Sequence, residues 1–279
     1  MEHTELLGSS KELIAYDKLD VTCVGGETVV SACVEHTLTE RLSAYAAVSG
    51  KKLHFLSELV TNTNYGITDA HQHFETRWLD AGIDRPILNL SIPLLGAHQI
   101  ENAVTAIEIT QRFLSRRTAT LLSATEISAA LARVRWAGRM ERISEKPDIW
   151  IDVGHTPDAL RRVIGTILEL YRREKLLVVY GISYNKDAQN ITHLIESNFD
   201  EIVLTKAYKN GTDVNTLKEA FSEQHRITAM FNQIEDAVSF ALQQGSEREK
   251  TVIVLGGLFL AVEFKVAFQG GNPRALQFF

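Results

Sequence analysis

Three side chains with ligand-binding chemistry flank one predicted strand-to-helix turn of this 279-residue chain: Arg139, Asp152 and His155. The apolar run 148–153 predicts a short buried strand, and Thr156 followed by Pro157 is typical of a helix N-cap and first turn. Asp152 and His155 are therefore expected at the carboxyl end of a strand, just before helix amides that favour anions. The pattern predicts a ligand site. The alternative is that Asp152 only braces the turn.

A second group of polar side chains lies on a predicted amphipathic helix over residues 96–114. The apolar residues of this helix share one face, and His98 and Asn102 lie one helical step apart on another side. Asparagine is a poor residue for a helix interior, so contact with a ligand is one explanation for Asn102. A solvated polar face is the other.

Strands and helices alternate regularly after residue 139. The predicted strands are 149–153, 176–180, 201–205, 226–231 and 251–255, and the predicted helices are 157–172, 187–197, 213–223 and 234–244, the last ended by Gly245. Parallel strands need crossover helices, and right-handed crossovers cover both faces of a sheet. We therefore predict an α/β fold whose C-terminal domain, residues 138–279, is Rossmann-like with a mostly parallel sheet.

The first half of the chain, residues 1–137, also predicts α/β layers but in a less regular order. Its expected elements are helices over 10–18, 31–48 and 125–133, strands near Val21 and over 52–56, and extended segments over 73–79 and 86–92. Trp136 to Gly138 is the predicted hinge between the two domains.

Composition and charge narrow the classes of partner. The chain is 45% hydrophobic and 23% charged, which is ordinary for a globular protein. A net charge of -6 without a basic run argues against nucleic-acid binding. The longest apolar run, 252–262, is too short to span a bilayer, and the N-terminus lacks the features of a secretory signal, so we expect a cytoplasmic protein without a membrane partner. Cys23 and Cys33 lack metal-ligand spacing and are expected to be reduced thiols.

Six motifs stand in a characteristic order. They are HTELLGSSKELIAYDK (3–18), PLLGAHQIENAVTA (93–106), WAGRMERI (136–143), DVGHTPDA (152–159), YGISYNKDA (180–188) and VLGGLFLAVE (254–263). In these motifs the chain resembles the folylpolyglutamate synthase and dihydrofolate synthase family of ATP-dependent Mur ligases. The resemblance implies that residues 1–137 are part of a Mur ligase central domain. It also implies a reaction in which ATP and Mg²⁺ activate a folate or pteroate carboxylate as an acyl phosphate, which the amine of glutamate then attacks.

The resemblance implies nucleotide-binding roles for three residues. Asn102, Arg139 and Asp152 match family residues that hold ATP, with the aspartate bonding hydroxyls and the arginine and asparagine fixing the base and phosphates. We therefore expect Asn102 to lie across a cleft from Arg139 and Asp152.

It also implies roles in metal binding and catalysis for three more residues. His3 matches a histidine that contacts Mg²⁺, and His155 matches a histidine near the incoming glutamate. Lys18 matches a lysine that becomes carbamylated and supports a metal. Carbamylation needs a deprotonated lysine, and hence partial burial or neighbouring cations. A solvated lysine near a helix end is the alternative.

Several positions depart from the family pattern. Residues 154–156 read Gly-His-Thr where the family has Ala-His-Asn, and residues 256–258 read Gly-Gly-Leu where the family has Gly-Ser-Leu. Loss of the serine hydroxyl is expected to remove about 1 kcal/mol of amino-acid binding, which leaves the identity of the amino acid open. Leu19 and Asp20 follow Lys18 where the family prefers Ala-Gly.

A phosphate-binding loop of the form GxxxxGK[ST] is found nowhere in the 279 residues. The amides and lysine of such a loop cradle the β and γ phosphates, and losing one such donor costs about 3 kcal/mol, or about a hundredfold in rate. We therefore expect the chain alone to be almost inactive, with an open sheet edge and a missing N-terminal ligase fragment as a partner. Two alternatives remain: a non-catalytic nucleotide-binding or scaffold homologue, and a relative of the ligases that act on UDP-MurNAc-peptides.

Overall fold

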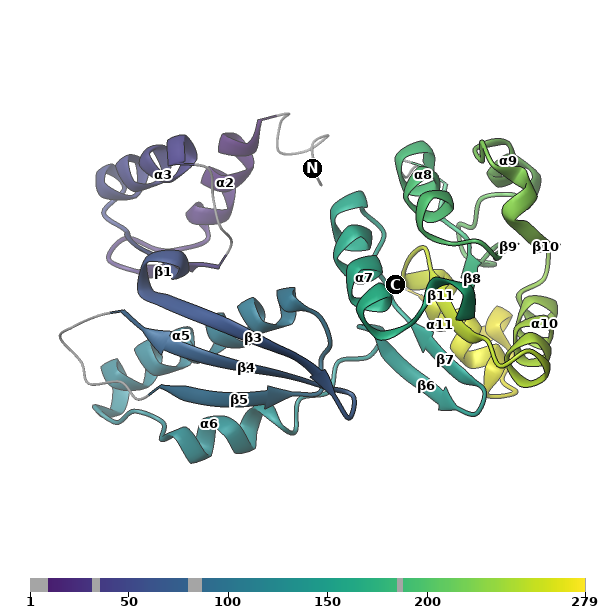
Figure 1. Cartoon of the computed structure of the whole chain (residues 1–279). Helices are drawn as coiled ribbons and strands as arrows, with labels where there is room; N and C mark the ends of the chain where they lie inside the picture. Colours follow the sequence, from purple (N-terminus) through teal and green to yellow (C-terminus); the bar gives the residue numbers. More distant parts are fainter. Residues whose placement is uncertain (1–9, 32–35, 80–86, 185–187, 279) are drawn as a thin grey trace. The chain divides into compact units, whose positions relative to one another are not determined.

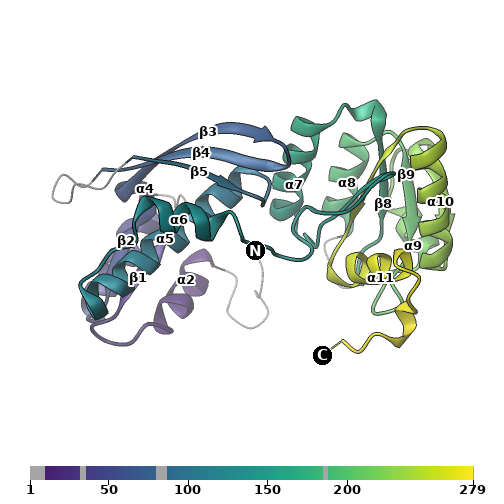
Figure 2. The same cartoon turned by 90° about the horizontal axis from the view of Figure 1, so that it is seen from below.

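A computed structural model describes residues 10–31, 36–79, 87–184 and 188–278. The chain forms two compact units, one comprising residues up to Pro93 and Ala97–Val134, and the other comprising Leu94–Gly96 and Arg135 onward. Figures 1 and 2 label their elements from two directions. The domain boundary that we placed between residues 137 and 138 stays a prediction.

The second unit is built on a six-stranded sheet in the order β10-β9-β8-β11-β7-β6, in which only the β6–β7 pair is antiparallel. This confirms the predicted α/β class with a mostly parallel sheet. The strands are β6 (Glu141–Glu145), β7 (Asp148–Ile151), β8 (Leu176–Tyr180), β9 (Ile202–Thr205), β10 (Ile227–Phe231) and β11 (Thr251–Leu255). The helices are α7 (Pro157–Leu170), η1 (Arg173–Lys175), α8 (Ala188–Asn198), α9 (Val214–Glu219), η2 (Gln224–Arg226), α10 (Ile234–Glu247), α11 (Leu258–Phe268) and η3 (Pro273–Ala275).

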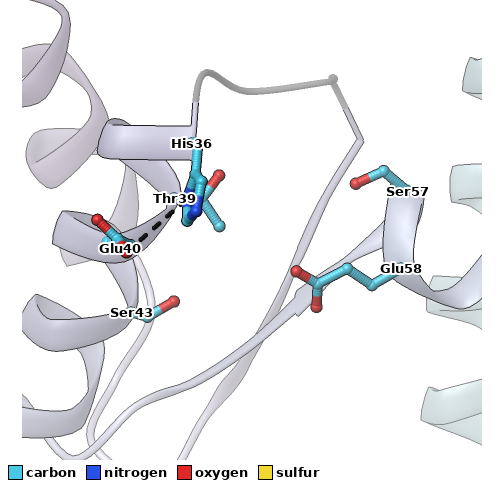
Figure 3. A pocket seen from close by; sticks show the side chains of 6 residues that line it. All are labelled: His36, Thr39, Glu40, Ser43, Ser57 and Glu58. Atoms are coloured by element: carbon cyan, nitrogen blue, oxygen red, sulfur yellow. Dashed lines mark ion pairs between the residues drawn. The ribbon is translucent and has the colours of Figure 1, made fainter.

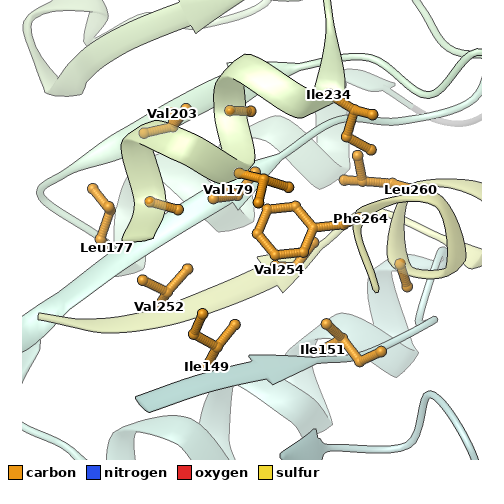
Figure 4. Packing of buried hydrophobic residues seen from close by; sticks show 14 of the residues in the cluster. Ile149, Ile151, Leu177, Val179, Val203, Ile234, Val252, Val254, Leu260 and Phe264 are labelled. Carbon is orange, nitrogen blue, oxygen red and sulfur yellow. The ribbon is translucent and has the colours of Figure 1, made fainter. Parts of the chain in front are cut away.

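Helices cover both faces of this sheet. Alternate residues of the central strands, among them Leu177, Val179 and Val254, pack against α10 and α11 in one buried cluster, which Figure 4 shows. Because side chains alternate along a strand, Tyr180 lies next to Val179 but points to the opposite face. There its hydroxyl lies 3.2 Å from the Thr192 hydroxyl of α8, and α8 packs against α7.

One expectation for this unit was wrong, and one strand was missed. Gly245 does not end α10, which continues to Glu247. Gly245 is buried there, and a Cβ atom on it would lie only 2.5 Å from the Pro147 Cβ, so close packing explains the glycine. The antiparallel strand β6 was not predicted, because four of its five residues are polar and none of them is fully buried.

The first unit contains two small sheets: the parallel pair β1-β2 and the antiparallel sheet β3-β4-β5. Its strands are β1 (Glu27–Val30), β2 (Lys52–Phe55), β3 (Val60–Thr68), β4 (His71–Trp78) and β5 (Leu88–Ile92). Its helices are α2 (Lys11–Asp20), α3 (His36–Val48), α4 (Leu56–Leu59), α5 (Ala97–Thr118) and α6 (Ala124–Leu131). The strand expected near Val21 was wrong, since Val21 is the C-cap of α2 and is 85% exposed.

In the part of the chain that the structure describes, no helix is both long and apolar enough to cross a membrane.

Candidate ligand site at the carboxyl edge of the parallel sheet

The carboxyl ends of β7 and β11 form a switch point in the second unit. The two strands are neighbours, yet α7 follows β7 on one face of the sheet while α11 follows β11 on the other. Open α/β sheets bind their ligands at such points, because the two connections leave in opposite directions. The helix start predicted at Thr156 is confirmed: its hydroxyl accepts a hydrogen bond from the Ala159 amide at 3.3 Å.

Glycine residues let the main chains of neighbouring strands approach closely at this edge. Gly256, which follows β11, has φ +133°, and a Cβ atom on it would lie 1.8 Å from the Gly181 carbonyl oxygen. Gly181 follows β8, and a Cβ atom there would lie 2.2 Å from the Thr205 carbonyl oxygen. Three neighbouring strand ends therefore touch through their main chains, where only glycine fits.

Asp152 ties two turns of the site together. The residue is 2% exposed; one carboxylate oxygen accepts the Met140 amide at 2.9 Å and the other accepts the Gly154 amide at 2.7 Å. Burial raises the pKa of the Asp152 carboxyl, while these two hydrogen bonds and the Arg139 charge act in the opposite direction. The contacts show the bracing role for Asp152. Its bond to nucleotide hydroxyls stays a prediction.

Arg139 lies on the turn that Asp152 braces. Gly138 and Met140 on either side have positive φ angles of +72° and +42°, and the Gly138 carbonyl accepts the Val153 amide at 2.8 Å. The Arg139 side chain is exposed. The structure thus brings Arg139 and Asp152 together, with the buried carboxylate fixing the backbone that presents the guanidinium.

His155 lies between the starts of α7 and α11. Its Cβ is 3.5 Å from the position of a Cβ on Gly257, the N-cap residue of α11. Its Nδ1 is 3.3 Å from the Val153 carbonyl oxygen, which can only accept, so Nδ1 carries the proton when they bond. The half-buried ring is thereby held at the sheet edge beside the first-turn amides of α11.

Asn102 belongs to the other unit. It is exposed on α5, and its amide donates to the Gln99 side-chain oxygen at 3.0 Å. Gln99 is 7% exposed and lies 3.1 Å from the His98 ring. The polar side of α5 is therefore ordered by its own side chains, and the approach of Asn102 to Arg139 stays a prediction.

Of the two predicted metal-linked residues, Lys18 and His3, the structure describes Lys18 alone. The Lys18 side chain is 65% exposed, and its ammonium lies 3.9 Å from the Asp17 carboxylate, which fits the solvated alternative. Its carbamylation stays a prediction. His3 lies outside the described residues. Across the described ranges, no group of three His, Cys, Asp or Glu side chains is placed to hold a metal ion.

Sequence reasoning missed a polar pocket of about 660 Å³ in the first unit. Figure 3 shows it between α3 and α4, the helices that follow β1 and β2. Its lining residues are His36, Thr39, Glu40, Ser43, Ser57 and Glu58. A pair of parallel strands, each followed by a helix, was the signal that could have located it. Its two carboxylates make the pocket a poor host for a triphosphate.

Comparisons with known proteins place this geometry in a family. Residues 138–258 match the family model for the Mur ligase glutamate ligase domain. The second unit therefore contains a Mur ligase C-terminal domain.

The chain as a whole is a homologue of folylpolyglutamate synthase and dihydrofolate synthase, as the motifs predicted. It is 25% identical over 273 residues to folylpolyglutamate synthase of Lacticaseibacillus casei, covering 98% of this chain and 61% of that protein. It is 26% identical over 271 residues to a probable bifunctional folylpolyglutamate synthase/dihydropteroate synthase of Haloferax volcanii, covering 96% of this chain and 31% of the relative.

A solved structure shows the same fold. Folylpolyglutamate synthase of Mycobacterium tuberculosis, complexed with ADP and AMPPCP, superposes with a TM-score of 0.77 at 23% identity, over 93% of this chain and 59% of that one. The chain thus spans between about a third and three fifths of the length of these relatives.

Proposed function

We propose that this chain supplies the adenosine side and the amino-acid side of an ATP-dependent amide ligase that adds glutamate to a folate or pteroate carboxylate. The observation that carries the proposal is the carboxyl edge of the second unit, where Asp152 fixes the turn of Arg139 and His155 lies against Gly257. The names of the relatives supply the reaction class. The cytoplasm is the proposed location.

The donor set suits an adenine nucleotide. An exposed arginine can stack on a purine or donate two N–H groups to a phosphate. The helix amides at the sheet edge also favour the negative charge of a phosphate. Asp152 has both oxygens engaged by amides, but each carboxylate oxygen can accept a further bond. Bound ATP would supply the phosphoryl group that activates the acid; Arg139, Asp152 and Asn102 would bind and orient it.

Among the described residues no three His, Cys, Asp or Glu side chains form a ready-made cage for Mg²⁺, which nucleotide sites hold through one or two carboxylates and the phosphates themselves. The cradle for the β and γ phosphates is likewise not encoded in a GxxxxGK[ST] motif of these 279 residues. We assign both to the proposed missing N-terminal ligase fragment, the partner that turnover requires.

The amino-acid side is assigned to His155 and the start of α11. When Nδ1 donates its proton to the Val153 carbonyl, Nε2 of the neutral ring is a hydrogen-bond acceptor. The first-turn amides after Gly257 can donate to a carboxylate. These groups would hold the amino acid and orient its amine.

The test is to add an N-terminal ligase segment to the chain and measure ADP release with folate or pteroate acids plus glutamate. We expect turnover that falls by about a hundredfold or more in His155→Ala, because a positioning contact is lost. The matched control is His193→Ala on α8, whose side chain is 74% exposed. If the bound segment and chain release no ADP with any such pair, the proposal fails.

A non-catalytic nucleotide-binding scaffold is the second candidate, favoured by the lack of a phosphate-loop motif in the sequence. Under that function the complete assembly would bind nucleotides with and without a γ-phosphate equally well and never hydrolyse them. Calorimetric titration of ATP and ADP into the assembly separates the two.

A further inference from the structure

The loop that joins β9 to α9 is fixed at the carboxyl edge of the sheet; we term residues 206–211 the β9 loop. Its end pairs with residues 182–184, the segment that follows β8. The Tyr184 amide donates to the Asn210 carbonyl at 3.0 Å, and Ser183 bridges to the residue after Asn210. This pairing brings the β9 loop to the end of β8, the strand next to β11.

A buried carboxylate of α11 holds the middle of the β9 loop. Glu263 is 0% exposed; one of its oxygens accepts the Tyr208 amide at 2.6 Å and the other accepts the Lys209 amide at 2.9 Å. Burial raises the pKa of the Glu263 carboxyl, while these two bonds act in the opposite direction. Burying a carboxylate is costly unless it is hydrogen-bonded, so the two bonds tie the conformation of the β9 loop to α11.

The side chain of Tyr208 is held from two further elements. Its hydroxyl donates to the Glu235 carboxylate of α10 at 2.6 Å. The Arg274 guanidinium of η3 lies 4.5 Å from the centre of the Tyr208 ring and donates to its hydroxyl at 3.0 Å. Surface loops are ordinarily more mobile than this, and a supporting shell of contacts is typical of loops that bind a ligand. The β9 loop is therefore preformed.

The two lysines of the β9 loop differ in their surroundings. The Lys206 ammonium lies 3.7 Å from the Asp213 carboxylate, which balances its charge. Lys209 is exposed, and its main chain is fixed by the bond to Glu263 and by its neighbour Tyr208. Lys209 is thus the lysine whose backbone is held in place beside the segment that follows β8. An ammonium on a fixed backbone suits an anionic ligand.

We propose that Glu263 is a positioning residue for amino-acid recognition: it fixes the β9 loop so that the Lys209 ammonium binds the side-chain carboxylate of the incoming amino acid. The proposal rests on the proposed function and deepens it, because it names the group that selects a dicarboxylic amino acid. The first-turn amides of α11 are assigned to the other carboxylate. Neighbouring strands lie about 4.8 Å apart, so the ends of β8 and β11 are close enough for one amino acid to contact both.

The first experiment titrates L-glutamate into the 279-residue chain and follows the backbone amides by NMR. We expect the amides of Lys209 and Asn210 to shift. L-Glutamine, which has the same shape without the second charge, should bind about fivefold more weakly or less tightly still, because it forms no ion pair with Lys209. In Lys209→Met the two amino acids should bind equally well.

The second experiment tests Glu263 itself. In Glu263→Gln one side-chain oxygen must serve two backbone donors, so exchange of the Tyr208 and Lys209 amides should speed up by about tenfold or more while exchange in β8 is unchanged. The preference for glutamate over glutamine should be lost, but affinity for ADP should be unchanged. Glu169→Gln, at an exposed glutamate of α7, is the matched control and should alter none of these values.

A further variant covers the case in which Glu263→Gln fails to fold. Tyr208→Phe removes only the hydroxyl contacts to Glu235 and Arg274, and it should weaken the preference for glutamate in the same direction. With an added N-terminal ligase segment, Lys209→Met should raise the KM for glutamate by about tenfold or more and leave the KM for ATP unchanged.

The proposal is overturned if glutamate and glutamine bind the parent chain equally well, or if neither binds. It is also overturned if Glu263→Gln loosens the β9 loop without changing the preference for glutamate, since Glu263 would then be only structural. A preference for glutamate that depends on Lys209, without ADP release by the chain and added segment, refutes the ligase function alone. ADP release that is indifferent to Lys209 refutes this assignment alone.

Discussion

The carboxylate of Asp152 accepts hydrogen bonds from two backbone amides that lie on two different turns. Holding both turns therefore requires two acceptor oxygens. In Asp152→Asn, the side-chain NH₂ must face one of the amides of Met140 or Gly154, leaving two donors opposed. We expect the free energy of unfolding to fall by about 1–3 kcal/mol. Nucleotide affinity should fall too, because the turn of Arg139 is no longer fixed. Urea denaturation and calorimetric titration of ADP measure the two effects.

Asp158→Asn is the control for this substitution. Asp158 is also an aspartate near the site, but its side chain is 83% exposed and its ion pair with Arg161 lies on the surface of α7. Its change should stay within about 0.5 kcal/mol. Equal losses in the two variants would contradict the bracing role of Asp152.

The contact between Gly256 and Gly181 leaves no room for a methyl group. In Gly256→Ala, the new Cβ would lie 1.8 Å from a carbonyl oxygen at a φ of +133°, so both the contact and the backbone must distort. We expect a loss of about 3 kcal/mol or more in the free energy of unfolding. In Gly165→Ala, within α7, the Cβ meets nothing within 4 Å, and the variant should be more stable by up to about 1 kcal/mol. Thermal denaturation of both variants checks the pair; a Gly256→Ala protein as stable as the parent would refute the close contact.

At the level of elements, a histidine joins β2 to α5. His54 Nε2 lies 3.1 Å from the Arg112 guanidinium, and burial, reinforced by the Arg112 charge, lowers the pKa of His54 below its ordinary 6.5. The folded protein therefore binds fewer protons here than the unfolded chain. This contribution to stability is fully present above pH 6.5 and is lost as the pH falls below 6.5 through the folded-state pKa.

We expect the first unit to lose stability between about pH 7.5 and about pH 5.5, and His54→Gln to remove part of that dependence because glutamine does not titrate. Urea denaturation at the two pH values, followed by hydrogen exchange of β2, is the measurement. His71→Gln is the control, since His71 lies in β4 outside this network. An unchanged pH dependence in His54→Gln would show that other groups cause it.

Local patterns predicted the apolar strands, the edge strands β5 and β10 included, but missed the more polar edge strands β3 and β6. β8 and β11 were placed with their observed bounds because five consecutive buried residues form an unmistakable apolar run. β3 and β6 were missed because their partly exposed residues carry polar side chains such as Asn62 and Glu141. Strands at an edge depend on their neighbours more than on their own sequence.

The same distinction applies to the site. Arg139, Asp152 and His155 were recognised as a group because two turns close in sequence carry them. The contact of Gly181 with Gly256 was not, because it depends on β11 inserting between β7 and β8, an order that no local pattern encodes. The alternative in which Asp152 braces its turn was open from the sequence, and the amide contacts show that bracing directly.

At the scale of the whole molecule, the nucleotide site is proposed to be divided between this chain and its partner. The chain alone should bind ADP and ATP with dissociation constants within about threefold of each other. The reason is that the 279 residues contain no GxxxxGK[ST] motif, whose amides and lysine would bind the β and γ phosphates. Adding the N-terminal segment should tighten ATP more than ADP. Calorimetric titration with and without the segment gives both ratios. Strong preference for ATP in the chain alone would contradict this division of the site.

The backbone contacts at the sheet edge also set where new acceptor specificity can be engineered. A randomised library that includes Gly181 or Gly256 would consist mostly of misfolded members, since any larger residue collides with a neighbouring main chain. Diversity is better placed at His155, whose half-buried side chain lies at the same edge, so that selection explores recognition while the backbone contacts are left intact.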